Sequence, residues 1–252
     1  MVSRKPDFPE INRLLIGQFA LVDLGSASAR LPKGLEPFRR AITLIEIDAT
    51  SSSETANASY FRRIALKGPV SSKAERRTLH LRKFPQCSSF LSANPQLISA
   101  YGLQDYFEEQ SAVEFECHTL ASLLDAAGIN HMDLLKTDLE GIDFEVLASA
   151  PELVKYTLVV QSELRFQPLY EGEPSFHIVV GYLADLGFEI VTLWPEFWKY
   201  DMPQRDFVRD GRVGRQTLRR GERWLSALLC STRTTRGAES RFPAPPSPDR
   251  QN

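Results

Sequence analysis

The sequence predicts a doubly wound α/β domain with a mostly parallel central sheet. Two apolar segments near the N-terminus are rich in strand-forming residues, and each ends at acidic residues. In the second half of the chain, strand-like segments alternate with helix-like segments of roughly ten residues, which is typical of parallel strands joined by crossover helices. With 252 residues, 42% of them hydrophobic, the chain is long enough to bury the core of one such domain.

The first half of the chain is predicted to contribute two central strands and two shorter or more exposed ones. The central strands are buried apolar runs, and their crossover-length separation favours a parallel pair. Alternating apolar and polar residues indicate a half-exposed strand or hairpin arm further on. We predict strands at Phe19–Gly25, Ala41–Ala49, Arg63–Gly68 and Thr78–Phe84, a helix from residues 50–53 through Tyr60, and, within residues 87–116, a loop with one helix around Gln96–Tyr101.

The second half has clearer helix and strand signals. Leu120–Gly128 has helical spacing, with Thr119 as a candidate N-cap and a glycine at its end. The other elements follow in alternation. We predict strands at Met132–Leu139, Leu158–Phe166 and Phe188–Trp194, and helices at Leu120–Gly128, around Phe144–Leu153 and at Phe176–Leu186.

The alternating pattern ends at about Asp201. We therefore assign residues 1–200 to the α/β domain and residues 201–252 to a C-terminal extension. Arg209–Trp224 is locally basic, which indicates either a solvated face or a contact for an anionic substrate or surface. Residues 238–252 are rich in Pro and Ser and have few apolar groups to bury, so we predict that they are disordered.

Composition favours a small-molecule or carbohydrate partner. The net charge of -2 gives no global electrostatic reason to expect nucleic acid or an anionic membrane. Cys87, Cys117 and Cys230 lack the spacing of a zinc site or a disulfide framework, which favours a reducing compartment. The N-terminus has no long apolar segment, and about 18 consecutive apolar residues occur nowhere, so we expect a cytoplasmic protein without a membrane span.

Acidic residues at the ends of the predicted strands indicate a ligand site. In an open parallel sheet, ligands bind outside the carboxyl ends of the strands, where the strand order reverses. Asp23, Gly25 and Ser26 form a loop in which the glycine lets the backbone approach a ligand. Glu46 follows about 20 residues later, the spacing at which an acid after the second strand meets ribose hydroxyls. These four residues predict a nucleoside site.

The loop DLGSASAR indicates which nucleoside is the better fit. It has only the first glycine of the GxGxxG pattern that grips a dinucleotide pyrophosphate, so a nicotinamide or flavin cofactor is disfavoured. S-adenosylmethionine has an adenosine, no phosphate, and a sulfonium cation that carboxylates attract. A nucleotide-sugar or dinucleotide enzyme on a similar sheet stays open as a second hypothesis.

A longer block in the middle of the chain resembles a known family. Residues 117–150, CHTLASLLDAAGINHMDLLKTDLEGIDFEVLASA, resemble the hallmark block of the FkbM family of methyltransferases. Further similar segments are CSSFL upstream and SELRFQPLYEGEPSF and LADLGFEIVTL downstream, so the resemblance runs from about Phe19 to Leu193. It implies a Rossmann-like class I fold and an S-adenosylmethionine-dependent O-methyltransferase, acting on a hydroxyl of a sugar, glycolipid or secondary metabolite.

Methyl transfer to a hydroxyl requires alignment of the acceptor oxygen and removal of its proton. Asp138 and Glu140 follow a strand end and precede Gly141, so Asp138 is the first candidate for the base or substrate-orienting group and for a cofactor contact. The other catalytic candidates are Glu140, Lys136, Glu163 and His177, and structural alternatives for such residues include an ion pair or a surface histidine. We predict no metal, because hard cations need more oxygen ligands than the sequence assigns.

Three departures from the family pattern support a competing hypothesis. The loop after Asp23 lacks a second glycine, IEIDA replaces the common FEP, and residues 118–121 lack an aspartate. A catalytically degraded methyltransferase fold that serves as a binding module is therefore the alternative to an enzyme.

Overall fold

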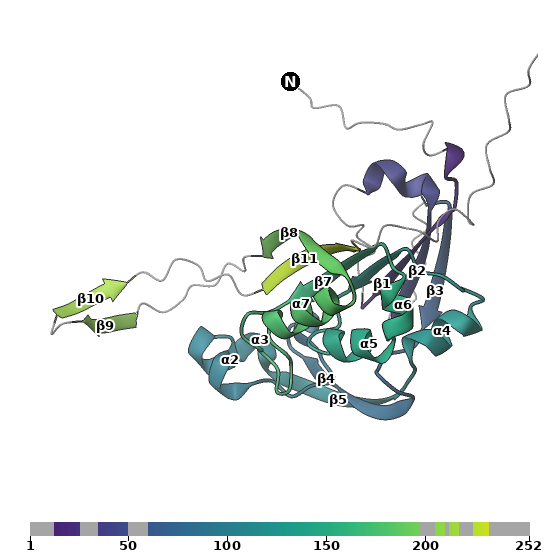
Figure 1. Cartoon of the computed structure of the whole chain (residues 1–252). Coiled ribbons are helices and arrows are strands. Elements are labelled where there is room, and N and C mark those ends of the chain that lie inside the picture. The colour runs from purple at the N-terminus through teal and green to yellow at the C-terminus, as the bar shows by residue number, and fades with distance from the viewer. Residues whose placement is uncertain are drawn as a thin grey trace, which may run out of the picture.

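A computed structural model of the chain describes residues 13–25, 35–49, 60–196, 205–209, 212–216 and 224–231. Its main sheet contains β1 (Phe19–Leu24), β2 (Ile42–Asp48), β3 (Arg62–Lys67), β6 (Leu134–Thr137), β7 (Val159–Leu164), β8 (Phe188–Glu196) and β11 (Trp224–Ser231). The strand order is β3-β2-β1-β6-β7-β11-β8 (Figure 1). The first five strands in this order pair in parallel, whereas β11 pairs antiparallel with β7 and β8. The predicted doubly wound, mostly parallel sheet is confirmed.

One face of this sheet is covered by four helices, which Figure 1 shows grouped together. These are α4 (Leu120–Ala126), α5 (Asp143–Ser149), α6 (Pro151–Lys155) and α7 (Phe176–Asp185). Alternate residues of each strand point to this face because side chains along a strand alternate between its two sides. Val22, Leu24, Ile45, Leu135 and Val160 thus lie fully buried in one core with the helices.

The opposite face has its own smaller core. Leu21, Ile42, Leu44 and Leu134 are buried there, and Leu35 packs against them just before the 3-10 helix η1 (Glu36–Ala41). The polar residues Asp23, Glu46 and Lys136 have the same parity in their strands as these leucines. They therefore project from this face, close to the carboxyl edge of the sheet.

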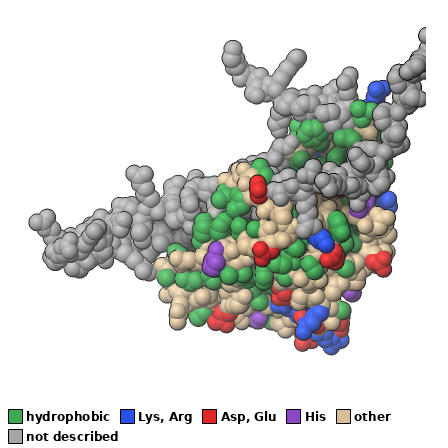
Figure 2. Space-filling model, viewed as in Figure 1, with side chains coloured by type: hydrophobic (Ala, Val, Ile, Leu, Met, Phe, Trp, Pro, Cys, Tyr) green, Lys and Arg blue, Asp and Glu red, His purple; other side chains and the backbone are tan. Residues whose placement is uncertain are grey.

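A separate hairpin lies beside the main sheet. It consists of β4 (Glu75–Arg82) and β5 (Glu109–Cys117), which pair antiparallel; between them are η2 (Pro85–Cys87), α2 (Pro95–Tyr101) and α3 (Gln104–Phe107). Figure 2 shows charged side chains of both signs gathered at this edge of the molecule. The exposed ion pair Arg76–Glu116 joins the two strands, and Lys83–Glu108 joins the residues just beyond their paired ends.

The hairpin confirms one prediction and corrects another. Thr78–Phe84 was predicted as a half-exposed strand or hairpin arm, and β4 is such an arm. The helix around Gln96–Tyr101 is also present, with Asn94 as its N-cap. However, the predicted loop over residues 87–116 contains β5. This strand was missed because most of it is exposed, so it lacks a continuous apolar run, although every second residue is apolar at Val113, Phe115 and Cys117.

Most other predicted elements of the described chain are present with small shifts at their ends. The helix predicted around Phe144–Leu153 is divided into α5 and α6 at Pro151, which has no backbone N–H to continue the first helix. Ser26, the helix predicted from residues 50–53 and the predicted disorder of residues 238–252 lie outside the described residues.

The stretch predicted as a C-terminal extension contributes a strand to the main sheet. Strand β11 lies between β7 and β8, so these two strands do not pair with each other. The alternation of strand and helix signals ends near Asp201, so the sequence did not predict that the chain returns to the main sheet at β11. Two further strands from the same stretch, β9 (Arg205–Arg209) and β10 (Arg212–Gln216), pair as a small antiparallel sheet. Within the described chain, no helix is both long and apolar enough to cross a membrane.

Truncation tests the contribution of β11. A chain ending after residue 223 loses the strand that bridges β7 and β8, which exposes two strand edges. We expect it to aggregate or to lose its cooperative thermal transition, as measured by circular dichroism and size-exclusion chromatography. A chain ending after Ser231 keeps every described strand of the sheet and serves as the control. Equal melting temperatures for the two truncations would contradict a structural role for β11.

Candidate active site

The carboxyl ends of the central strands bring the predicted acids into one row. In the parallel register Asp23 lies directly beside Glu46 on one side and beside Lys136 on the other. Thr137 of β6 lies beside Ser162 of β7, so the residues that follow them, Asp138 and Glu163, are also neighbours. The strand ends thus collect four of the predicted site acids at one edge.

Asp23 forms a buried ion pair with Lys136. The Lys136 Nζ lies 2.9 Å from the Asp23 Oδ1 and donates a hydrogen bond to it. Burial by itself lowers the pKa of Lys136, but the carboxylates of Asp23 and Asp138 outweigh it and raise the pKa above its ordinary value. Lys136 is therefore a cation at neutral pH.

Glu46 is held by Arg63 of β3. The Arg63 Nε donates to the Glu46 Oε2 and its Nη2 donates to Oε1 at 2.8 Å, so the pair is bidentate. Both side chains are largely buried. Tyr60 lies near the pair, and burial is the main cause that raises its pKa to about 12. The predicted ribose-binding acid is thus fixed in position by a cation on the neighbouring strand.

Arg165 contacts three glutamates near the carboxyl edge of the sheet. Its guanidinium contacts Glu140 at 2.8 Å, Glu173 at 2.9 Å and Glu163 at 3.4 Å, and only 2% of its side chain is exposed. Tyr170 donates a hydrogen bond from its hydroxyl to the Glu140 Oε2 at 2.8 Å, and its ring lies against the guanidinium. This network connects the turn after β6, the end of β7 and the loop before α7.

The network has three glutamates around one guanidinium, and burial is the main cause that raises the pKa of two of them. Burial raises the pKa of Glu140 to about 7, although Arg165 opposes the shift. Burial, together with Glu140 and Asp138, raises the pKa of Glu163 well above its ordinary value against the same opposition. Glu163, which lies beside Asp138, therefore holds its proton more tightly than an exposed glutamate does.

The turn that carries Asp138 and Glu140 is tightly constrained. Glu140 has a positive φ of 51°, which is uncommon for a residue other than glycine. Asp143 accepts hydrogen bonds from the backbone N–H groups of Leu139 and Gly141, and Ser89 donates to the Glu140 carbonyl at 2.6 Å. Burial raises the pKa of Asp143 to about 6. These contacts hold the backbone of the turn against α5 and the segment after η2.

Three of the predicted site residues lie close enough to share a ligand. Carboxylate oxygens of Asp138, Glu140 and Glu163 all lie within 4.8 Å of one another, so together they offer more oxygen ligands than the sequence assigned. The arrangement has the donor chemistry of a divalent cation site, although Arg165 already balances part of its charge.

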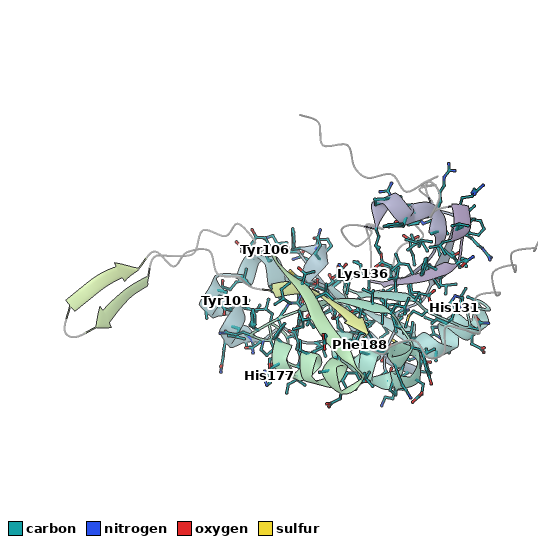
Figure 3. The ribbon with its side chains drawn as sticks, turned by 45° about the horizontal axis from the view of Figure 1, so that its top comes forward. Tyr101, Tyr106, His131, Lys136, His177 and Phe188 are labelled. Carbon is teal, nitrogen blue, oxygen red and sulfur yellow. The ribbon has the colours of Figure 1, made fainter. Side chains whose placement is uncertain are left out.

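His177 is placed apart from these acids. It is exposed at the start of α7, and its Nδ1 lies 3.0 Å from the hydroxyl of Ser175. Figure 3 shows it well away from Lys136. Of the predicted catalytic residues, the structure brings together Lys136, Asp138, Glu140 and Glu163 but not His177.

Arg63, Arg165 and Asp143 are the important residues that sequence reasoning missed. Arg165 follows Glu163 by two residues in SELRF, and Arg63 begins a predicted strand, so neither position by itself indicates a partner. Asp143 carried a weak signal, because an acid in the first turn of a helix commonly accepts from nearby backbone N–H groups. Their partners are set by contacts between different strands and loops.

A comparison with protein families decides the family of this chain. A model described as the methyltransferase FkbM domain matches residues 38–190, more than half of the 252 residues. The chain belongs to the FkbM methyltransferase family. No curated protein sequence matches it.

The FkbM match covers part of the site. Glu46, Lys136, Asp138, Glu140 and Glu163 lie within it, and the family supports a methyltransferase function. Strand β1 precedes the matched residues, so Asp23 and Gly25 lie outside the FkbM match.

Replacement of Gly25 tests the close approach of β1 to the turn after β6. A Cβ on Gly25 would lie 2.0 Å from the Asp138 carbonyl oxygen, and the φ of Gly25 is +76°. We expect Gly25→Ala to destabilise the fold by about 3 kcal/mol or more in urea denaturation. Gly172→Ala is the matched control: its φ is +80° but nothing lies within 4 Å, so a loss of about 1 kcal/mol is expected. Equal losses would show that the contact with Asp138 is unimportant.

The pH dependence of stability tests the environment of Glu140. In the folded protein Glu140 keeps its proton up to about pH 7, whereas the unfolded chain releases it near the ordinary value of 4.5. The folded state binds more protons in this window, so Glu140 lowers stability as the pH rises through it. Relative to Glu140→Gln, the parent should lose on the order of 2 kcal/mol between about pH 5 and about pH 8.

The free energy of unfolding by urea, measured across that range, gives this comparison. Glu116→Gln, which alters an exposed ion pair with Arg76, should have a curve parallel to that of the parent. Parallel curves for Glu140→Gln and the parent would contradict the raised pKa.

Proposed function

We propose that this protein is an S-adenosylmethionine-dependent O-methyltransferase that acts on a hydroxyl of a sugar, glycolipid or secondary metabolite. The observation that carries the proposal is the single row of acids along the carboxyl edge of the sheet. Asp23 and Glu46 lie at one end of this row, and Asp138 and Glu163 lie at the other. A nucleoside and a hydroxyl acceptor would then meet at the same edge.

Asp23 and Glu46, at one end of the row of acids, form the cofactor side of the proposed site. The space beside Gly25 is filled by the Asp138 carbonyl, so this glycine joins the two sides of the site and the cofactor contacts are assigned to Asp23 and Glu46. Asp23 offers a buried carboxylate for a cationic group, and Glu46 is oriented by Arg63 with lone pairs that ribose hydroxyls can use. When bound, S-adenosylmethionine supplies an activated methyl group on a sulfonium.

Asp138 and Glu163, at the other end of the row, form the acceptor side, and they suit a hydroxyl acceptor. Asp138 is the more exposed of the two acids there, with 40% of its side chain accessible, and the Lys136 ammonium lies 3.8 Å from it. Asp138 is therefore the accessible carboxylate that accepts the hydroxyl proton. Glu163, whose pKa is raised by burial, lies beside Asp138 and hydrogen-bonds the same acceptor.

The other candidate residues have supporting roles in this proposal. Glu140 is bound by Arg165 and Tyr170, so it holds the turn rather than contacting the acceptor. His177 is not required as a base, since it is exposed and bonded to Ser175. A cytoplasmic location stays a prediction from the sequence.

A specific observation favours a second candidate, a methyltransferase fold that serves only as a binding module. Both carboxylates of the cofactor half already have intramolecular cations, Lys136 and Arg63, so they are satisfied without a ligand. The altered loop after Asp23 points in the same direction.

Isothermal titration with S-adenosylmethionine and S-adenosylhomocysteine separates the two candidates. We expect saturable binding of both ligands and no competition by NAD. Glu46→Gln should weaken S-adenosylhomocysteine binding roughly tenfold, because it loses the charge that strengthens hydrogen bonds from ribose hydroxyls. Asp138→Asn should keep that affinity and reduce methylation of hydroxylated acceptors, measured with radiolabelled cofactor.

Glu116→Gln is the control, since its carboxylate lies on the exposed hairpin. Unchanged affinity in Glu46→Gln would refute the ribose assignment. No detectable heat with the parent at millimolar ligand would refute the enzyme and leave the binding module.

A further inference from the structure

Lys136 contacts both halves of the proposed site. Its Nζ lies 2.9 Å from the Asp23 Oδ1, on the cofactor side, and 3.8 Å from the Asp138 Oδ2, on the acceptor side. The first distance is a hydrogen bond, whereas the second is an ion pair without one. A single ammonium therefore stands between the two acids.

We propose that Lys136 is a positioning residue that holds Asp23 while the cofactor is absent and shifts its hydrogen bond to Asp138 when a cationic cofactor binds against Asp23. The inference rests on the proposed function, because it requires S-adenosylmethionine as the ligand. If Lys136 shifts in this way, cofactor binding places a hydrogen-bonded ammonium on Asp138 at the acceptor side of the site.

Electrostatics gives the reason for the shift. The sulfonium brought close to Asp23 supplies the positive charge that Lys136 provides in the present arrangement, and the two cations repel each other. The repulsion is strong because only 11% of the Lys136 side chain is exposed to water. Asp138, the residue that follows β6, is the alternative partner, since its Oδ2 already lies 3.8 Å from the Lys136 Nζ.

The movement required is small. Shortening the distance to Asp138 from 3.8 Å to hydrogen-bond length takes about 1 Å, which rotation of the lysine side chain provides without moving β6. The surrounding carboxylates raise the pKa of Lys136, so the side chain carries its charge in both positions. The backbone of the strand stays paired with β1 and β7 throughout.

Two ligands that differ in charge test this role. S-adenosylmethionine carries a sulfonium cation, and S-adenosylhomocysteine has a neutral thioether in its place. Without the lysine cation, Asp23 should favour the charged ligand, so Lys136→Met should raise the affinity ratio of S-adenosylmethionine to S-adenosylhomocysteine roughly tenfold. Lys136→Arg keeps the charge and should restore the parent ratio. Lys155→Met, on α6 and paired with Glu152, is the control and should have no effect.

A second variant tests whether the lysine moves. Asp138→Asn removes the carboxylate that receives Lys136, so it should lower the same ratio severalfold while leaving S-adenosylhomocysteine affinity unchanged. In the Lys136→Met background, Asp138→Asn should not change the affinity ratio further, because no lysine ammonium is present to bind the residue 138 carboxylate. This arm does not disturb the buried pair with Asp23, so it stays informative if Lys136→Met fails to fold.

The outcomes separate this inference from the proposed function. If the parent binds neither ligand, the proposed function fails. If the parent binds both but Lys136→Met and Asp138→Asn leave the ratio unchanged, Lys136 is a static ion pair and the inference fails. If Asp138→Asn lowers the ratio equally in both backgrounds, Asp138 acts directly on the sulfonium and the shift of Lys136 is refuted.

Discussion

The buried guanidinium of Arg165 holds together the edge of the sheet on which the proposed chemistry depends. It contacts Glu140, Glu163 and Glu173, which belong to three different segments, and the ring of Tyr170 covers it. A buried cation or carboxylate without a partner is strongly destabilising, so these groups are stable only as a set. The turn after β6, the end of β7 and the loop before α7 are thereby fixed relative to one another, and so is the position of Asp138 next to Glu163.

The same principle of paired charges recurs along the row of acids. Asp23 is matched by Lys136 and Glu46 by Arg63, each from a neighbouring strand. Such pairing lets a carboxylate stay charged while it is buried, which a binding site for a cationic cofactor requires. Asp138 has the weakest pairing and the greatest exposure of these acids, so it is the carboxylate best able to interact with an incoming acceptor.

The FkbM match includes the acceptor side of the proposed site completely and the cofactor side in part. The matched residues 38–190 contain the turn with Asp138 and Glu140 and the strand that ends at Glu163. The loop after β1 lies before the match, and DLGSASAR has only the first glycine of a GxGxxG pattern. Yet Gly25, the glycine that is present, is the one whose backbone touches the Asp138 carbonyl. The close approach between the two sides of the site is thus made by Gly25.

The sequence by itself determined the central strands, the helices that cover one face, and the collection of Asp23, Glu46, Asp138 and Glu163 at strand ends. These features follow from local periodicity and from the rule that parallel strands end at a common edge. Only the tertiary structure decided that β11 enters the sheet between β7 and β8, that β5 completes a hairpin, and that His177 lies apart from the acids. It also decided which cation stands beside each carboxylate. These outcomes depend on contacts between residues far apart in the chain, such as Lys136 with Asp23, and no local pattern specifies such a partner.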